Sequence, residues 1–321
     1  MQTPFRSKRN VILTSAINHV HSERNRTIKW LVYPAVIVVC NGQTWVSTLE
    51  CFMRKKINIG ALISGGGSNL QAIMDACESG GIHGRVVFVG SDNPAAPGLD
   101  KARQHGIPCF AVDYDAIARK VKADPSQVRY PQDLDMDHVF SAMMATNRHH
   151  DSESLNAFLQ TRIPAEAELI EHLALYSFDL LVLAGFMRTL TPYFIDRIND
   201  PPEPRRIMNI HPALLPSFPG VDGYGDTFRY GCKVGGSTVH FVDYGEDTGP
   251  IIGQAFFEIA ETDDLDAIRK KGLAEEWRLY PKCIQYAAEG RLKTEQMTHR
   301  LKNGKTVQRT VVRVLSKSDK H

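Results

Sequence analysis

From residue 57 onward, short apolar runs alternate with amphipathic stretches, and this alternation limits the possible folds more than any other feature of the chain. Each apolar run has the length of a strand, and each amphipathic stretch has the length and period of a helix. The runs cover residues 57–63, 85–91, 107–112, 179–186 and 206–211, and the stretches cover residues 68–79, 98–106 and 165–176. Repeated strand–helix units predict an α/β, Rossmann-like fold, in which helices flank a mostly parallel central sheet.

Other segments extend this pattern. Residues 237–243 and 251–259 have the composition of two more strands, and residues 263–290 that of a long closing helix, broken near Gly272 and Pro281. Thr191 and Pro192 are expected at the N-cap and first position of a short helix over 191–198. Residues 115–161 are too numerous for an ordinary connection, so we expect an insertion with short helical pieces at 116–123 and 137–146.

The two ends of the chain differ from this middle part. Residues 1–52 show no clear helix or strand period, and between residues 1 and 49 six Lys and Arg residues accompany a single acid, Glu23. We expect 1–52 to be an N-terminal extension, irregular or disordered, with an organelle transit peptide as the less favoured interpretation. Residues 53–293 are expected to form one domain, and residues 294–321 a basic C-terminal tail.

Composition argues against several classes of protein. The formal net charge of +2 provides no general attraction to nucleic acid or membrane. No apolar run reaches the roughly 18 residues of a membrane-spanning helix. The six cysteines are scattered without a Cys-x-x-Cys pair, which indicates free thiols in a reducing compartment and favours a cytoplasmic protein. His149, His150 and Asp151 have no fourth ligand at a suitable spacing, so a solvated loop is favoured over a metal site.

The glycine-rich stretch ISGGGSNLQ follows the first predicted strand and begins the first predicted helix. Glycines allow the backbone to approach a ligand closely, and a helix N-terminus presents free N–H groups to an anion. Gly67, Ser68 and Asn69 are therefore candidates for binding a single phosphate, because the pattern is not the G-x-G-x-x-G of dinucleotide sites. The structural alternative is a glycine turn with a serine cap.

The stretch NIHPALLPSFPG begins at the end of a predicted strand, where open α/β proteins place their chemistry. Asn209 and His211 are two residues apart, so their side chains share one face of the strand. An amide and an imidazole on one face can both donate to a developing oxyanion. The prolines that follow restrict the loop beyond the strand.

The stretch HFVDYGEDTGPII places Asp247 in a turn between two predicted strands. A carboxylate beside His211 would favour the imidazolium form of that ring. By itself, the sequence Asp-Thr-Gly-Pro is only a good turn.

Together these segments resemble the folate-dependent formyltransferase family. ISGGGSNLQAI, LAGFMRTLTP, NIHPALLPSFPG, VHFVDYGEDTGPII and a late Tyr-Pro occur in order between about residues 57 and 293. The glycine loop and GFMR narrow the resemblance to the phosphoribosylglycinamide formyltransferase branch. It implies a single catalytic domain that transfers a formyl group from 10-formyltetrahydrofolate to the amine of N1-(5-phospho-D-ribosyl)glycinamide in de novo purine (IMP) biosynthesis.

The resemblance also implies roles for individual residues and the absence of a metal. The catalytic residues are Asn209, His211 and Asp247; the nucleotide-binding residues are Gly67, Ser68, Asn69 and Glu276; the folate-binding residues are Arg162, Met187, Arg188, Thr189, Leu190 and Asn209. The implied partners are small-molecule substrates, with no nucleic acid and no membrane, for a monomer or homodimer.

The chain departs from the family pattern in four places. Residues 1–52 and the insertion are additional, and NDPPEP lengthens the segment before the catalytic strand. Between Val221 and Gly236, Asp222 and Tyr224 stand in a segment that usually carries histidines. Two alternatives remain: a formyltetrahydrofolate hydrolase, although 1–52 is too short for its usual regulatory domain, and a folate- or nucleotide-binding homologue with an altered substrate or no catalysis.

Overall fold

The computed structural model describes residues 35–40, 43–48, 55–146 and 151–317. The chain divides into two compact units, Met1–Lys55 and Lys56–His321. In the first unit, β1 (Ala35–Cys40) and β2 (Gln43–Thr48) form an antiparallel hairpin. The expectation of an irregular extension is therefore wrong for these strands, whose β-branched residues favour extended backbone. Residues 1–34 lie outside the described residues.

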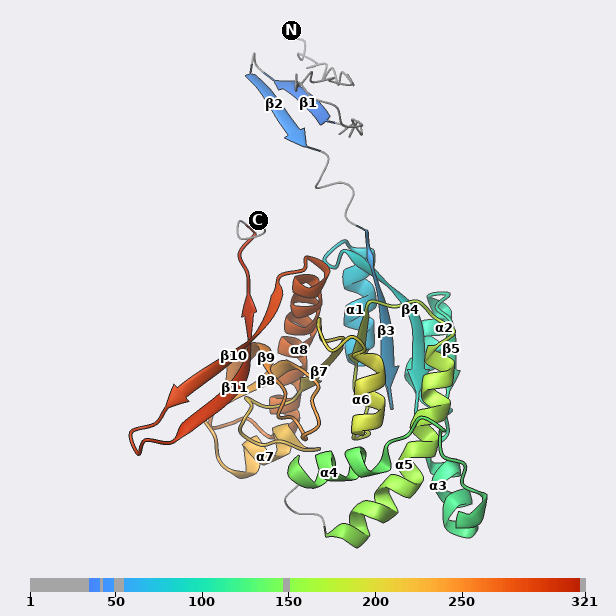
Figure 1. Cartoon of the computed structure of the whole chain (residues 1–321). Coiled ribbons are helices and arrows are strands. Elements are labelled where there is room, and N and C mark those ends of the chain that lie inside the picture. Colours follow the sequence, from blue (N-terminus) through green and yellow to red (C-terminus); the bar gives the residue numbers. More distant parts are fainter. Residues whose placement is uncertain (1–34, 41–42, 49–54, 147–150, 318–321) are drawn as a thin grey trace, which may run out of the picture. The chain divides into compact units, whose positions relative to one another are not determined.

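The second unit is built on a seven-stranded sheet with the order β5-β4-β3-β6-β7-β8-β9 (Figure 1). The strands are β3 (Ile57–Ile63), β4 (Gly84–Ser91), β5 (Cys109–Ala111), β6 (Leu180–Leu183), β7 (Ile207–His211), β8 (Val234–Phe241) and β9 (Ile251–Glu258). The first five are parallel, whereas β8 pairs antiparallel with both β7 and β9. The predicted mostly parallel, Rossmann-like sheet is confirmed.

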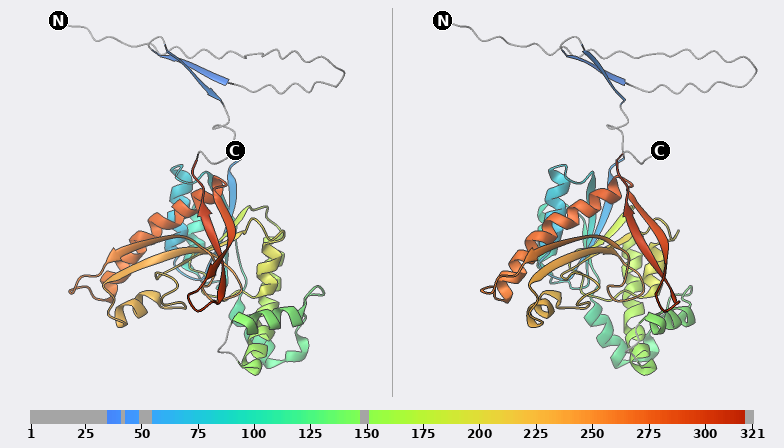
Figure 2. Two further views of the ribbon diagram at one scale, coloured as in Figure 1. Left: turned by 60° about the vertical axis from the view of Figure 1, so that its left-hand side comes forward. Right: turned by 90° about the vertical axis from the view of Figure 1, so that its left-hand side faces the viewer.

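Helices cover both faces of this sheet, as the two views of Figure 2 show. One face carries α1 (Ser68–Glu78), α2 (Pro97–Gln104) and α8 (Leu265–Ala288), and the other carries α3 (Tyr114–Ala123), α5 (Ser152–Leu173) and α6 (Pro192–Ile198). Successive strand residues alternate between these layers: Leu180 and Val182 pack toward α1 and α8, and Leu181 and Leu183 toward α5 and α6. A sheet buried on both faces accounts for the unbroken apolar runs in the sequence.

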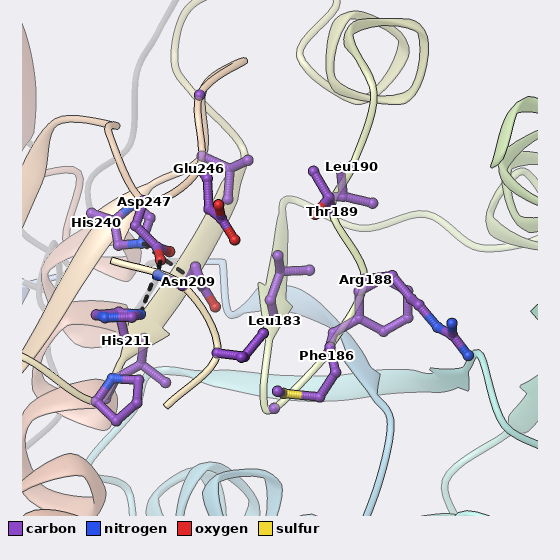
Figure 3. Close-up of a pocket in the computed structure, with 18 of the residues that line it drawn as sticks. Leu183, Phe186, Arg188, Thr189, Leu190, Asn209, His211, His240, Glu246 and Asp247 are labelled. Carbon is purple, nitrogen blue, oxygen red and sulfur yellow. Dashed lines mark hydrogen bonds and ion pairs between the residues drawn. The ribbon is translucent and has the colours of Figure 1, made fainter. Parts of the chain in front are cut away.

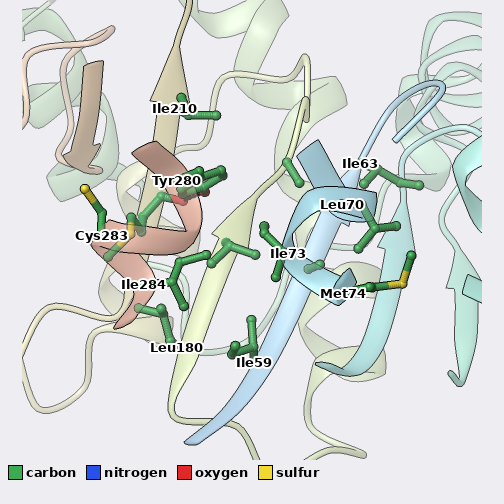
Figure 4. Packing of buried hydrophobic residues seen from close by; sticks show 14 of the residues in the cluster. Ile59, Ile63, Leu70, Ile73, Met74, Leu180, Ile210, Tyr280, Cys283 and Ile284 are labelled. Carbon is green, nitrogen blue, oxygen red and sulfur yellow. Dashed lines mark hydrogen bonds between the residues drawn. The ribbon is translucent and has the colours of Figure 1, made fainter. Parts of the chain in front are cut away.

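Helix α8 is continuous, so the expected breaks at Gly272 and Pro281 are wrong. Its packing explains why the helix tolerates a proline, because the residues around Pro281 are fixed against the sheet (Figure 4). Tyr280 is fully buried, and its hydroxyl donates to the carbonyl oxygens of Leu183 (3.2 Å) and Met208 (2.8 Å). These bonds satisfy the buried hydroxyl and attach the helix to two adjacent strands.

The predicted insertion is more helical than expected. Helix α3 begins at Tyr114, α4 spans Met136–Thr146, and α5 begins at Ser152 rather than near residue 165. Asp151 is the N-cap of α5 and accepts the N–H of Ser154 at 2.8 Å. The insertion core, defined here as the buried cluster between α4, α5 and α6, consists of Val139, Met143, Leu155, Leu159, Ile163 and Tyr193.

The described part of this region contains no group of three or more His, Cys, Asp and Glu side chains suited to a metal ion, nor does the rest of the described chain. His149 and His150 lie outside the described residues. Their neighbour Asp151 acts as a helix cap.

The C-terminal segment is not a simple basic tail. β10 (Leu292–Arg300) and β11 (Thr306–Val314) form an antiparallel hairpin, and Leu292 and Val312 pack against the core beneath α8. Among its lysines and arginines, this segment has apolar residues in a weak alternating pattern. These apolar residues pack the hairpin against the domain. None of the helices in the described residues is long and apolar enough to cross a membrane.

The topology places a crevice between β3 and β6. From β3 the chain moves outward through β4 and β5, and then returns to place β6 on the other side of β3. At such a switch point the loops after the two central strands diverge, and ligands of open α/β sheets bind outside their carboxyl ends. The glycine loop after β3 and residues 184–190 after β6 are the two loops concerned.

Candidate active site

A cavity of about 290 Å³ opens at the carboxyl ends of β6 and β7 (Figure 3). Its walls come from Leu183 and residues 185–190 after β6, residues 209–212 at the end of β7, Gly220 and Val221, His240, residues 242–247 of the β8–β9 turn, and Asn69 and Glu276. The sequence placed Asn209 and His211 on one segment and Asp247, Asn69 and Glu276 on three others, and the fold brings all five residues to one cavity.

His211 is held between two acceptors. It is 3% exposed, its Nδ1 lies 3.1 Å from Oδ2 of Asp247, and its Nε2 lies 2.7 Å from the carbonyl oxygen of Phe218. Neither acceptor carries a proton to donate when Asp247 is ionised, so only an imidazole with hydrogen on both nitrogens satisfies both contacts. The site is therefore arranged for a cationic imidazolium at the end of β7.

Asp247 lies in the left-handed backbone region, with φ of 53°. Aspartate tolerates this conformation better than most residues. Gly249 closes the neighbouring turn, and a Cβ added at this position would lie 1.7 Å from the oxygen of Phe241. The carboxylate accepts the N–H of Gly220 at 2.8 Å. Burial raises the pKa of Asp247, but its contacts with His240, His211 and Gly220 outweigh burial, and the net pKa is lowered.

His240 on β8 is a member of the site that the sequence analysis missed. Its Nε2 lies 3.3 Å from Nδ2 of Asn209 and 3.6 Å from Oδ1 of Asp247, and its Nδ1 lies 2.9 Å from the oxygen of Phe241. The Nδ1–H of His240 donates to Phe241, and its Nε2 faces both Asp247 and the Asn209 amide. At most one N–H of the Asn209 amide is directed at this ring, which leaves the second amide N–H unused. The available signal was the alternation of VHFVD, which is typical of a strand. In the structure this strand pairs with β7 and places His240 opposite Asn209.

The glycine loop has the geometry expected for close approach of a ligand. Gly67 has φ of 65° and precedes α1, and an added Cβ on Gly65 or Gly66 would meet no heavy atom within 4 Å. Ser68 is exposed at the first position of the helix and makes no side-chain cap bond. Gly67 and Ser68 do not line the cavity itself, whereas Asn69 does.

Glu276 from α8 meets Asn69 from α1 at the cavity wall. Nδ2 of Asn69 donates to Oε2 of Glu276 at 2.6 Å, and the hydroxyl of Tyr224 donates to Oε1 at 2.6 Å. Burial raises the pKa of Glu276, and the two donors oppose that effect. The sequence analysis named Asn69 and Glu276 separately and did not foresee their contact with each other or with Tyr224.

The segment 187–190 lies along the cavity, but Arg188 is not directed into it. Figure 3 shows the Arg188 guanidinium pointing away from His211. It forms ion pairs with Asp92 and, at 3.0 Å, with Asp115. Burial lowers the pKa of Arg188, and the two carboxylates reverse this effect, so the net pKa is raised. All four residues predicted for the folate side, Met187, Arg188, Thr189 and Leu190, line the cavity, although the charge of Arg188 is taken up by the two carboxylates.

Unlike Arg188, Arg162 lies away from the cavity lining. Its guanidinium stacks over the rings of Tyr114 (5.2 Å) and Phe158 (4.9 Å), and its buried Nη1 has no hydrogen-bond partner. Thr191 and Pro192 occupy the N-cap and first position of α6, as predicted, but the Thr191 side chain makes no capping bond. Its hydroxyl and its N–H both donate to Glu166.

Comparison with known proteins gives consistent matches. The formyl transferase family model matches residues 57–284. Phosphoribosylglycinamide formyltransferase of Escherichia coli (strain K12) is 34% identical over 240 residues, which are 75% of this chain and 91% of that protein. The enzyme of the same name from Bacillus subtilis (strain 168) is 32% identical over 69% of this chain and 90% of its own. The crystal structure of glycinamide ribonucleotide transformylase 1 from Symbiobacterium toebii superposes with a TM-score of 0.59, at 36% identity, over 81% of this chain and 95% of that one.

Proposed function

The chain belongs to the formyl transferase family, and on that basis we propose that it is a phosphoribosylglycinamide formyltransferase of purine biosynthesis. The reaction moves a formyl group from 10-formyltetrahydrofolate to the amine of N1-(5-phospho-D-ribosyl)glycinamide. The observation that carries the proposal is the convergence of Asn209, His211 and Asp247 on a cavity that also contains Glu276 and Asn69.

The chemistry requires stabilisation of a tetrahedral oxyanion. The amine nitrogen attacks the formyl carbon, a C–N bond forms, and the carbonyl electron pair moves to oxygen. Collapse of this intermediate breaks the bond to N10 of the folate, while the proton lost by the amine passes to N10 through water. In our proposal, the unused N–H of Asn209 and the charge of His211 stabilise the oxyanion, and the ionised Asp247 maintains that charge.

The cavity and the glycine loop next to its residue Asn69 suit the two substrates. The glycine loop and the N-terminus of α1, an 11-residue helix, provide backbone N–H groups for the phosphate of the nucleotide. Leu183, Phe186, Leu190 and Val242 form an apolar wall that suits a flat pteridine ring. The folate is a co-substrate here, and this scheme assigns no step to a metal. Arg162 and Arg188 would have to leave their present partners to contact the folate.

Two alternatives use the same site differently. In a hydrolase, water would replace the amine as the nucleophile, and a binding protein would hold the ligands without transfer. The feature that favours transfer is Glu276, a buried carboxylate on the cavity wall that is suited to an amine rather than to water alone. The cytoplasmic location and the monomer or homodimer state remain predictions.

A single assay separates these functions. Purified protein is supplied with 10-formyl-5,8-dideazafolate, and release of 5,8-dideazafolate is followed by absorbance with and without the glycinamide nucleotide. The proposed transferase releases the product only when the nucleotide is present. Release without the nucleotide would identify a hydrolase, and ligand binding without any release would identify a binding protein.

A further inference from the structure

Tyr224, in the segment where the chain departs from its family, touches the carboxylate expected to meet the substrate amine. Its hydroxyl lies 2.6 Å from Oε1 of Glu276, and Asn69 binds Oε2 at the same distance. The three side chains come from α7 (Gly223–Arg229), α8 and α1, and are 6%, 5% and 7% exposed. We propose that Tyr224 is a positioning residue that orients Glu276 and keeps it ionised for the amine of the nucleotide. This inference rests on the proposed function.

The contact has a fixed direction. Burial, together with the charge and hydrogen bond of Glu276, raises the pKa of Tyr224 far above its ordinary value, so the phenol keeps its proton and always donates. Each oxygen of Glu276 thus receives one donor from the protein and can accept a second. Within the described residues Glu276 has no ion pair, although it lines the cavity.

Asn69 provides a second hydrogen-bond acceptor for the same ligand. Oδ1 of Asn69 is buried and has no hydrogen-bond partner in the described structure, and Asn69 also lines the cavity. A buried acceptor without a partner is unfavourable unless a ligand supplies the donor. Glu276 and Asn69 together therefore form a subsite for a group rich in N–H bonds, such as a primary amine or ammonium.

The fold makes room for the phenol at Gly272 of α8. A Cβ added to Gly272 would lie 2.1 Å from Cζ and 2.4 Å from the hydroxyl oxygen of Tyr224. Glycine within a helix is unfavourable by about 1 kcal/mol relative to alanine. The close approach explains its presence here, because any larger residue would push the hydroxyl away from Glu276.

The direct test replaces Tyr224 by Phe, which keeps the ring and removes the donor. Loss of a hydrogen bond to a charged group corresponds to about 10- to 100-fold, so we expect the KM for the nucleotide to rise by this factor while the KM for the formyl donor stays unchanged. Without the donor the pKa of Glu276 rises further, so the acid side of the activity profile should move to higher pH. The control is Tyr230→Phe, because Tyr230 directly follows α7 and is 79% exposed.

The outcomes separate this inference from the proposed function. Absence of nucleotide-dependent transfer in the wild-type protein overturns both. An active wild type, with Tyr224→Phe and Tyr230→Phe alike in nucleotide KM and pH profile, overturns the role of Tyr224 alone. A loss confined to thermal stability, with unchanged KM and pH profile, also overturns it, because it indicates a structural contact only.

A second variant tests the steric part. Gly272→Ala should raise the nucleotide KM in the wild-type background and should add little in a Tyr224→Ala background, since the clash then disappears. Equal effects of Gly272→Ala in both backgrounds would show that the glycine serves another purpose and would contradict the proposed link.

Discussion

The catalytic cavity and the insertion core lie in one unit and are built on opposite principles. At the cavity, His211, Asp247 and Glu276 are buried polar groups, each held by partners from other segments. In the insertion core, Leu159 and Met143 are 1% exposed among other apolar side chains. Buried polar groups carry chemistry at a cost in stability, whereas apolar clusters contribute stability without chemistry. Substitutions in the two regions should therefore separate activity from stability.

The largest separation is expected for His211→Ala. Removal of the imidazole takes away the charge beside the oxyanion, and losses of this kind reduce kcat by about 100- to 1000-fold. Binding of the nucleotide should persist, because the phosphate contacts are proposed to lie at the glycine loop. Steady-state kinetics and nucleotide titration measure the two quantities, and near-normal turnover would remove His211 from the mechanism.

The converse change is Leu159→Ala in the insertion core. Truncation of a fully buried leucine typically destabilises a protein by about 2–5 kcal/mol, because transfer energy is lost and a cavity remains. We expect this loss in chemical denaturation, with kcat per folded molecule unchanged. Leu175→Ala, at a leucine that is 75% exposed just beyond α5, is the matched control. A fall in kcat without a fall in stability would show that the insertion acts on catalysis.

Glu166 lies between the two regions, on α5 beneath the start of α6. Burial raises its pKa to about 7, although the Thr191 hydroxyl, the Thr191 N–H and Arg162 act in the opposite direction. The folded protein therefore keeps this proton between about pH 4.5 and pH 7, where the unfolded chain releases it, and stability falls as pH rises through that window. Glu166→Gln should remove this part of the decline, on the order of 3 kcal/mol in total. If the free energy of unfolding changed with pH in the same way for the wild-type protein and Glu166→Gln, the raised pKa could not be assigned to Glu166.

The smallest effect is expected for a substitution inside the cavity, at the carboxylate of Asp247. Asp247→Asn preserves the left-handed backbone, which asparagine also tolerates, and removes only the charge beside His211. We expect turnover to fall by about 10- to 100-fold, the usual value of a hydrogen bond to a charged group. Turnover equal to that of the wild-type protein would rule out this pairing as functional.

The fold could be predicted from the sequence because strands covered on both faces leave continuous apolar runs. The candidate site was predicted in part, since Asn209 and His211 stand at a strand end and Asp247 in a turn, whereas Arg162 does not line the cavity. Contacts between side chains of different elements, in contrast, produce no recognisable pattern in the sequence. The carbonyl of Phe218 at His211, the hydroxyl of Tyr224 at Glu276 and the carboxylates that hold Arg188 depend on tertiary packing.

Other parts were missed for local reasons. The hairpin of β10 and β11 carries so many charged residues that its alternation resembled a tail. The start of α5 was placed too late, because its first turns pack on the insertion core and not on the sheet. In each case a short-range pattern was weak and a long-range contact decided the structure.

The contact between Tyr224 and Gly272 sets an order in which mutations can accumulate in this lineage. Tyrosine at 224 can contact Glu276 as it does here only when residue 272 is glycine, because any Cβ at 272 would overlap the ring in this position. Glycine can arise first, at about 1 kcal/mol of helix stability. Once both are present, reversion at 272 is unfavourable until the residue at 224 becomes smaller. Sequences that descend from this chain and keep tyrosine at 224 should therefore also keep glycine at 272, whereas the glycine can persist without the tyrosine.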